Sequence, residues 1–274
     1  MSDPSSVGGG ETKPSTLSEW LEWKQRHPSD YKTFDLIEIT EQRKISKPEI
    51  NALASKISSA RVDPELVRRA AEKVGWKNAA TTLVVPMLPT LPNVRKGLFG
   101  ETLAGMTLVD FFGYQIPVQK LRYSITKNQT LPGTDIIAVK YKDGGLTELC
   151  FVEVKLRTGE DTAAAKEAYG EIQRQRVQKI PALLSFITAR LQAEQNPLFD
   201  LFLRYLLDRH DTTKIESTHI CLVWEKMNWS EKTLVNLEDS ITTPSASVLT
   251  VDLVIIENLV PLVGSVFEEL VLGG

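Results

Sequence analysis

The chain has 274 residues, enough for one large domain or for one domain with a smaller appendage, and its 42% hydrophobic and 24% charged residues are ordinary for a globular protein. Its 32 Lys and Arg against 35 Asp and Glu give a formal net charge of -3, which excludes a polybasic arm and an acidic disordered chain. The same balance leaves nucleic-acid binding open, because a nucleic acid responds to the local charge along a groove.

The sequence also predicts where the protein works. Cys150 and Cys221 are too few for a disulfide framework and both lie in apolar runs, which indicates buried thiols in a reducing compartment. The first residues lack the basic and apolar regions of a secretory signal. The most apolar run, at 251–264, is interrupted by Glu257 and Pro261 and falls short of the roughly 18 residues of a membrane helix. We therefore expect a cytoplasmic protein with no membrane partner.

The first third of the chain predicts a mainly helical region ahead of the main domain. Residues 1–16 are rich in Ser, Gly and Pro and are expected to be disordered. Residues 17–93 are expected to regulate access to a site or to bind a partner. The elements expected there are a helix at 17–27, a short strand at 35–40, a helix that starts with the capping-box pattern SKPE at 46–49, a helix at 63–75 and an extended, proline-rich connection at 81–92.

From residue 94 onward the pattern predicts an α/β domain, spanning 94–274, with a mixed central sheet flanked by helices. β-branched runs indicate strands, and the DGG at 143–145 is typical of a hairpin turn. In chain order the expected elements are a helix at 95–113, a strand-like segment at 114–125, strands at 135–141 and 149–157, helices at about 160–180 and 181–195, and strands at 218–224 and 247–259.

Two neighbouring strands carry three charged residues in an apolar setting. Asp135 opens the first strand, while Glu153 and Lys155 lie two apart on the next and therefore face the same side. Charged side chains are rarely buried without a partner or a metal. The hairpin between the strands brings Asp135 near Glu153, so we expect two carboxylates and a lysine to meet.

This combination predicts a site for a divalent cation. Two carboxylates at close range repel each other, and a hard cation with oxygen ligands, Mg²⁺ or in its place Mn²⁺, relieves that repulsion. The backbone carbonyl of Val154 lies between the Glu153 and Lys155 side chains and is a further candidate ligand. Such a metal polarises a phosphate and acidifies a bound water, and Lys155 adds positive charge beside that water. No small-molecule cofactor is expected.

Asp135 followed by Glu153-x-Lys155 across a hairpin resembles the PD-(D/E)XK nuclease superfamily, with Thr134 in the place of its proline. The order helix, three strands, helix, strand is similar to the restriction-endonuclease-like core of that superfamily. The resemblance implies a further acidic residue on the preceding helix, where Glu101 stands, as a ligand or as a support for one. It also implies a polar residue on the following helix that reaches the site, for which Gln173 is the candidate, with Lys166 and Tyr169 on the same helix face.

A narrower resemblance covers about residues 95–180. The run Lys96-Gly97, Gly100-Glu101, Lys120-Leu121, Gly133-x-Asp135 and Glu153-x-Lys155 is similar to the nuclease subunit of the Hachiman anti-phage defence systems. That subunit is usually paired with a helicase. The resemblance therefore implies a defence effector that works with a helicase.

The sequence as a whole predicts a Mg²⁺-dependent DNA nuclease. Two other interpretations stay open, a restriction-type endonuclease and a module on the same fold that binds nucleic acid or a partner with little chemistry of its own. His219 and Cys221 alternate on one strand, but no second pair of zinc ligands follows at short spacing, so core packing is the better interpretation. The candidates for a basic rim along the DNA backbone are Arg95, Lys96, Arg157, Lys166, Arg174 and Arg176.

Overall fold

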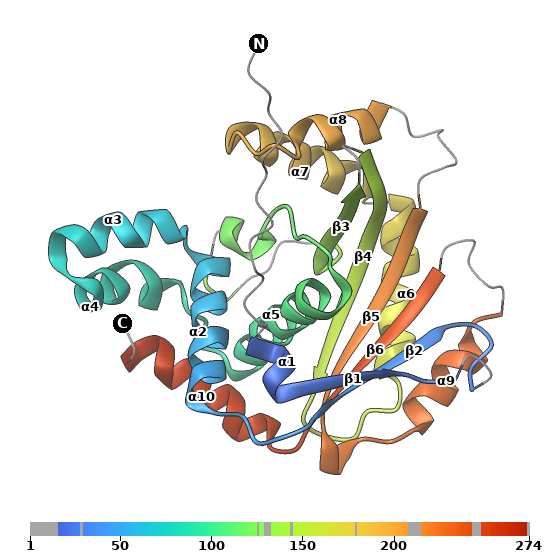
Figure 1. The fold of residues 1–274 in the computed structure, drawn as a ribbon. Helices are drawn as coiled ribbons and strands as arrows, with labels where there is room; N and C mark the ends of the chain where they lie inside the picture. The colour runs from blue at the N-terminus through green and yellow to red at the C-terminus, as the bar shows by residue number, and fades with distance from the viewer. Residues whose placement is uncertain are drawn as a thin grey trace.

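The computed structural model describes residues 16–27, 30–124, 126–128, 133–142, 145–178, 180–207, 215–242 and 248–272. Within these residues, six strands form one curled, mixed sheet in the order β1-β2-β6-β5-β4-β3 (Figure 1). The expected α/β class and the mixed sheet are thereby confirmed. The strands are β1 (Leu21–Gln25), β2 (Asp35–Glu41), β3 (Ile136–Lys142), β4 (Gly145–Arg157), β5 (Ile215–Glu225) and β6 (Val248–Ile256).

The four inner strands run parallel and the two edge strands run antiparallel to their neighbours. β4, β5, β6 and β2 pair in parallel, whereas β1 pairs antiparallel with β2 and β3 antiparallel with β4. A parallel sheet needs cover on both faces, which explains why β5 and β6 are nearly continuous apolar runs rather than alternating ones. Because β3 and β4 form the edge hairpin, the residues expected to carry chemistry lie at the border of the sheet.

Helices cover both faces of the sheet (Figure 1). One face packs under α1, α2, α5 and α10. The other face packs under α6 and α9 near β5 and β6, and under α7 and α8 near β3 and β4. The bounds are α1 (Thr16–Trp20), α2 (Lys47–Arg61), α3 (Pro64–Val74), α4 (Trp76–Ala79), α5 (Pro92–Phe112), α6 (Ala164–Gln178), α7 (Ile180–Ala193), α8 (Phe199–Leu207), α9 (Lys232–Ser240) and α10 (Leu259–Leu272).

The helix boundaries follow the expected local signals where those signals are strong. The Ser46 amide donates a hydrogen bond to Glu49 Oε2 at 2.7 Å, which completes the capping box at the start of α2. Asp63 accepts a hydrogen bond from the Glu65 amide at 2.8 Å and caps α3. α5 ends at Gly113, whose φ of 69° is the left-handed conformation that suits glycine.

Three sequence predictions of secondary structure were wrong. Only Thr16–Trp20 of the expected 17–27 helix is helical, because Leu21–Gln25 pairs with β2. The connection at 81–92 contains the helical turns Ala80–Val84 and Val85–Met87 instead of extended chain. The expected strand at 114–125 reduces to one bridge, between Gln115 and Val139, and the turn Lys120–Tyr123. In each segment tertiary pairing or packing outweighed a weak local pattern.

The chain before residue 94 shares the sheet with the rest of the molecule. β1 and β2 extend the sheet beyond β6, and Trp20, Leu21 and Ile39 are buried in the same hydrophobic cluster as α5. α2 packs against α5 and α10. Residues 1–15, most of the segment expected to be disordered, and residues 143–144 of the expected hairpin turn lie outside the described part of the chain.

Candidate active site

The β3–β4 hairpin brings Asp135 and Glu153 together as expected. Ile136 pairs with Val152, which places Asp135, one residue before β3, beside Glu153. The Val154 amide donates a hydrogen bond to Asp135 Oδ2 at 2.8 Å. This bond ties the Asp135 carboxylate to the strand that carries Glu153, so the geometry of the pair is set by sheet register.

Lys155 joins this pair and adds a third acid. Its Nζ lies 3.0 Å from Glu153 Oε1 and 2.6 Å from Glu171 Oε2 on α6. Burial lowers the pKa of Lys155, but the hydrogen bond that it donates to Glu171 and the charge of Glu153 outweigh burial and raise that pKa above its usual value. Lys155 is therefore a charged ammonium held between two carboxylates.

Glu153 is a buried carboxylate that the protein satisfies only in part. It is 4% exposed, and its Oε2 has no hydrogen-bond partner among the described residues. Burial, together with the nearby Glu171 and Asp135, raises its pKa to about 9. Burial likewise raises the pKa of Asp135, against the opposing Val154 amide and the charges of Lys120 and Lys155. A positively charged ligand would bind favourably to a buried acid that has an oxygen without a hydrogen-bond partner.

Glu101 lies on α5, which packs against the other face of β4, and it is close enough to Asp135 for the two charges to interact. Gly100 lets α5 approach β4 closely, because a Cβ built there would lie 3.2 Å from Leu156 Cβ. Burial and then the charge of Asp135 raise the pKa of Glu101 to about 8, while Lys120 and Arg61 act in the opposite direction. α5 and the β3–β4 hairpin thus each supply carboxylates to one centre.

Two buried cations bind backbone carbonyl groups in the segment before Asp135. Lys120 is 8% exposed, and its Nζ donates to the carbonyl oxygens of Gly133, at 3.4 Å, and Thr134. Arg61 of α2 is 2% exposed and donates from Nη2 to the Lys127 carbonyl oxygen at 2.6 Å. Lys120 appeared in the sequence run quoted above without a role, and no sequence signal marked Arg61.

α6 contributes Glu171 where the sequence predicted Gln173. Gln173 is half-buried and makes no hydrogen bond within the described residues. The buried stripe of α6 is Ala164, Ala168 and Ile172, which turns Glu171 rather than Gln173 toward Lys155. The signal was present in the sequence, because apolar residues at i, i+4 and i+8 mark the packed face of a helix.

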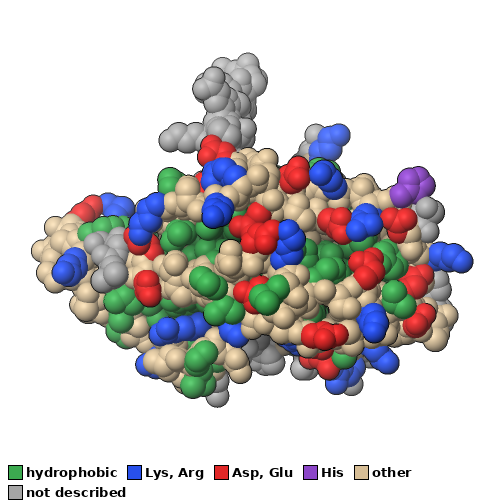
Figure 2. Space-filling view, turned by 90° about the horizontal axis from the view of Figure 1, so that it is seen from below, with side chains coloured by type: hydrophobic (Ala, Val, Ile, Leu, Met, Phe, Trp, Pro, Cys, Tyr) green, Lys and Arg blue, Asp and Glu red, His purple; other side chains and the backbone are tan. Residues whose placement is uncertain are grey.

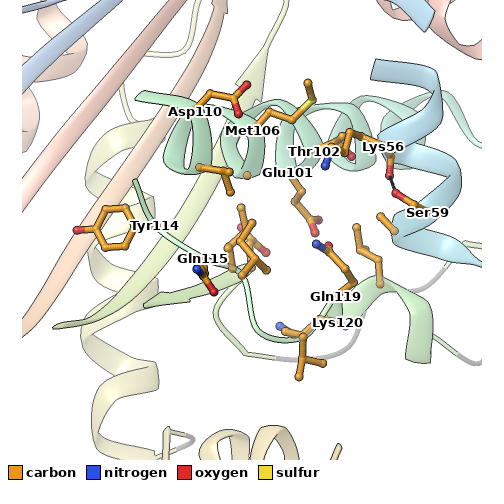
Figure 3. A pocket seen from close by; sticks show the side chains of 18 residues that line it. Lys56, Ser59, Glu101, Thr102, Met106, Asp110, Tyr114, Gln115, Gln119 and Lys120 are labelled. Carbon is orange, nitrogen blue, oxygen red and sulfur yellow. Dashed lines mark hydrogen bonds between the residues drawn. The ribbon is translucent and has the colours of Figure 1, made fainter. Parts of the chain in front are cut away.

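A cavity of about 320 Å³ opens beside Glu101 and Asp135 (Figure 3). Its walls come from α2, α5 and the segment 114–121, and the side chains of Glu101, Gln119 and Lys120 point toward its centre. Val109 lines the cavity and is 42% exposed, so the cavity reaches the solvent. The acidic centre therefore lies at the inner end of a solvent-connected hollow.

Comparison with known families gives the identity of the chain. The sequence model of the HamA family matches residues 16–269, which is most of the protein. The chain belongs to the HamA family. HamA is a component of the Hachiman anti-phage defence systems, the group that the run from Lys96 to Lys155 resembles. No curated protein matches the chain.

In this HamA-family chain the candidate basic residues are not equally free to bind DNA. Lys96 donates to Thr158 Oγ1 at 2.8 Å, and Arg157 is paired with Asp161 at 2.5 Å. Arg95 donates to the Pro89 carbonyl oxygen at 2.8 Å and stacks over Phe267. Lys166 and Arg174 are exposed on α6, and the side chain of Arg176 lies outside the described residues.

The surface of this HamA-family protein mixes both charges on the face shown in Figure 2, where Lys and Arg alternate with Asp and Glu. His219 is buried and its Nδ1 lies 2.7 Å from Asp252 Oδ2, which agrees with the core-packing interpretation. Among the described residues no group of three or more His, Cys, Asp or Glu side chains converges as a metal cage. No described helix is long and apolar enough to cross a membrane.

Proposed function

We propose that this HamA-family protein is a metal-dependent DNA nuclease of the PD-(D/E)XK type that acts in Hachiman defence together with a helicase. The observation that carries the proposal is the buried Glu153 beside Asp135 and Lys155, with Oε2 unpartnered among the described residues. Acids whose pKa is raised by burial and mutual repulsion are typical of functional sites. Asp252 beside His219 also has a buried Oδ1 without a partner among the described residues, so what distinguishes Glu153 is the second acid and the lysine beside it.

The residues present fit a hard divalent cation. Mg²⁺ is commonly held by one or two carboxylates while water and substrate phosphate fill its other positions, so it needs no cage of three acidic side chains. Asp135 and Glu153 would hold it, with the Val154 carbonyl and Glu101 as further candidates, and Mn²⁺ is a chemical substitute. When bound, the cation supplies Lewis-acid polarisation of the scissile phosphate and acidifies a water.

The protein's own groups position and stabilise the reacting atoms. Lys155 is charged and donates hydrogen bonds, so it would hold the attacking water or the oxygens of the phosphate as negative charge develops there. The contact with Glu171 holds the Lys155 ammonium beside Glu153 and restricts its orientation. Lys120 fixes the carbonyls before Asp135 and thereby fixes the start of β3.

DNA would be bound mainly through phosphates. Lys166 and Arg174 on α6 are the exposed candidates, although Arg174 Nε donates to the Gly170 carbonyl oxygen at 3.3 Å. Arg95, Lys96 and Arg157 also have partners within the chain. We propose that the helicase supplies much of the DNA affinity. Co-purification of a helicase with this protein would support this assignment. Co-purification of a methyltransferase would support the restriction-type alternative instead.

The test compares cleavage of plasmid DNA by the native chain with cleavage by a double variant, Glu153→Ala with Lys155→Ala, in Mg²⁺ and in EDTA. The expected result is that the native chain cleaves in Mg²⁺ but not in EDTA, and that the double variant cleaves in neither. The matched control removes the exposed ion pair Lys226–Glu257 in the same way and should cleave normally. Equal cleavage by both double variants would contradict the proposal, and absence of cleavage and of Mg²⁺ binding by the native chain would favour the non-catalytic module.

A further inference from the structure

The cavity beside the acidic centre has the size of a small-ligand site. Its volume of about 320 Å³ lies at the lower end of the range for such sites, roughly 300–1,000 Å³. Glu101 and Asp135 are among the residues that line it. A ligand in this cavity would therefore touch the groups that the proposed function places at the scissile phosphate.

One wall of the cavity is apolar. Met106 on α5 and Ile116 in the segment after α5 line it. Gly105 also lines the cavity, and a Cβ built there would come 3.0 Å from Ile116 Cδ1. The absence of a side chain at Gly105 therefore lets this wall pack closely while the cavity stays open in front of it. Such a wall suits the flat face of a ring.

Two polar residues that line the cavity have no side-chain partner among the described residues. The Gln119 side chain points into the cavity toward Glu101 (Figure 3), and its amide makes no hydrogen bond with any described residue. Lys56 of α2 is exposed at the rim, and its ammonium has no ion-pair partner in the described part of the chain. An amide can read the edge of a base by two hydrogen bonds, and an ammonium can meet a phosphate.

We propose that this cavity receives one unstacked nucleotide of the substrate strand, with its base between the apolar wall and Gln119. The proposal rests on the proposed nuclease function and adds a substrate class to it. A base stacked inside a duplex cannot enter a cavity enclosed by α2 and α5. The substrate is therefore single-stranded DNA, or duplex DNA from which one nucleotide is extruded next to the cleaved bond.

The test follows one fluorescent base without requiring cleavage. A single-stranded oligonucleotide with one 2-aminopurine in the middle of a purine run is bound to the full chain in EDTA at low salt. The fluorescence of 2-aminopurine rises when it leaves its stacked neighbours. The expected result is a rise on binding to the native chain, and the same rise for the Glu153→Gln variant.

Gln119→Trp fills the cavity, and Gln119→Ala is a milder variant that removes the amide while adding no bulk. Both should lose the fluorescence rise, and binding should weaken roughly tenfold, as when one base-stacking contact is removed. The matched controls are Gln192→Trp and Gln192→Ala, at an exposed glutamine of α7 away from the cavity. Melting temperatures of all four variants exclude simple unfolding.

An unchanged fluorescence rise in Gln119→Trp, or tight binding by the native chain with no rise, would overturn the nucleotide pocket. No binding of the oligonucleotide at low salt would overturn it as well. The failure of the nuclease proposal looks different, since the fluorescence rise would be present while DNA stays intact in Mg²⁺. Cleavage with no dependence on Gln119 would leave the nuclease proposal standing and remove the pocket.

Discussion

Lys155 Nζ lies 2.6 Å from Glu171 Oε2, so an acid on α6 holds the lysine of the Glu-x-Lys strand. The two residues are 16 positions apart and belong to different elements, β4 and α6, which pack against each other. Glu153 binds the same ammonium at 3.0 Å. Lys155 is therefore oriented by two acidic side chains, of which Glu171 is the one whose pKa is lowered, by its hydrogen bonds with Glu153 and Lys155.

Replacing Glu171 with Gln should lower kcat by roughly ten- to a hundredfold with little change in KM, because a misplaced catalytic group costs rate more than binding. Glu171→Asp should recover part of the loss, since it restores the charge. The measurement is steady-state cleavage of a labelled DNA. The control is Glu167→Gln, one turn earlier on α6, where the side chain is 59% exposed. Equal effects of both substitutions would show that Glu171 has no special role.

Removing the divalent cation should make the stability of the protein fall as the pH rises. The pKa of Glu153 is raised from 4.5 to about 9 and that of Glu101 from 4.5 to about 8, mainly by burial. An acid whose pKa is higher in the folded state than in the unfolded state stabilises the fold at a pH below its unfolded-state pKa. This contribution is lost as the pH rises toward the folded-state pKa. Thermal melting in EDTA should therefore decline between about pH 4.5 and 9.

Mg²⁺ or Mn²⁺ should reverse that decline, because a cation competes with protons for the same carboxylates. The Glu153→Gln variant in EDTA should melt higher than the native chain at pH 8, and calorimetry should show that it binds the cation weakly. A native chain whose melting temperature is flat across this range and insensitive to the cation would count against the metal site.

Substituting Gly100 with Val should disturb the candidate active site through α5. The added Cβ would lie 3.2 Å from Leu156 Cβ, which belongs to β4 and has little freedom to move. Overpacking of this kind costs about 1–3 kcal/mol of folding free energy, and the shift of Glu101 should lower activity as well. Urea unfolding and DNA cleavage measure the two effects.

Gly97→Val is the matched control for Gly100→Val. It makes the same change one turn earlier in α5, where a Cβ meets nothing within 4 Å. Both variants share the same change in helix propensity, so the difference between them isolates the contact with β4. Indistinguishable stability and activity of the two variants would refute the close approach of α5 to β4.

Glu49→Ala should lower the free energy of unfolding by about 1–3 kcal/mol, since the Ser46 amide and the Arg43 guanidinium lose a buried, charged partner. Burial raises the pKa of Glu49, but hydrogen bonds from Arg43 and Ser46 outweigh burial and lower that pKa to about 2. The stability it adds is therefore present above about pH 4.5 and lost as the pH falls through 2. The gap to the native chain in urea unfolding should narrow over that range.

The control for Glu49 is Glu72→Ala on α3, which removes an exposed ion pair with Arg68. Exposed pairs contribute little, so this variant should differ from the native chain by less than about 1 kcal/mol. If Glu72→Ala lowers the free energy of unfolding as much as Glu49→Ala does, the capping box contributes no more to stability than an exposed ion pair.

Several parts of this protein could be predicted because their determinants are local. The capping box at Ser46, the Asp63 cap and the glycine at position 113 define helix ends through backbone hydrogen bonds a few residues away. The Asp135 and Glu153-x-Lys155 cluster followed from strand alternation and one hairpin. Alternation in a strand and capping in a helix do not depend on distant neighbours.

Other parts could not be predicted because their determinants are distant in sequence. Leu21–Gln25 became a strand since β2 offered it a partner, although its own spacing suggested helix. α8 and α10 had no prediction at all, and their apolar faces make sense only against the core that they cover. The contact of Glu171 with Lys155 was not predicted, since the rotation of α6 about its axis depends on how Ala164 and Ala168 pack, and the role of Gln173 stays a prediction.

The sequence by itself determined the chemistry at the centre, namely two carboxylates and a lysine on one hairpin, because register and alternation follow from nearby residues. Only the tertiary structure decided what surrounds that centre. Glu171 from α6, Lys120 before β3 and Arg61 from α2 meet there because the sheet and its helices pack around it. Burial, which raises the pKa of Glu153 and Glu101, is likewise a property of the packed whole rather than of any local segment.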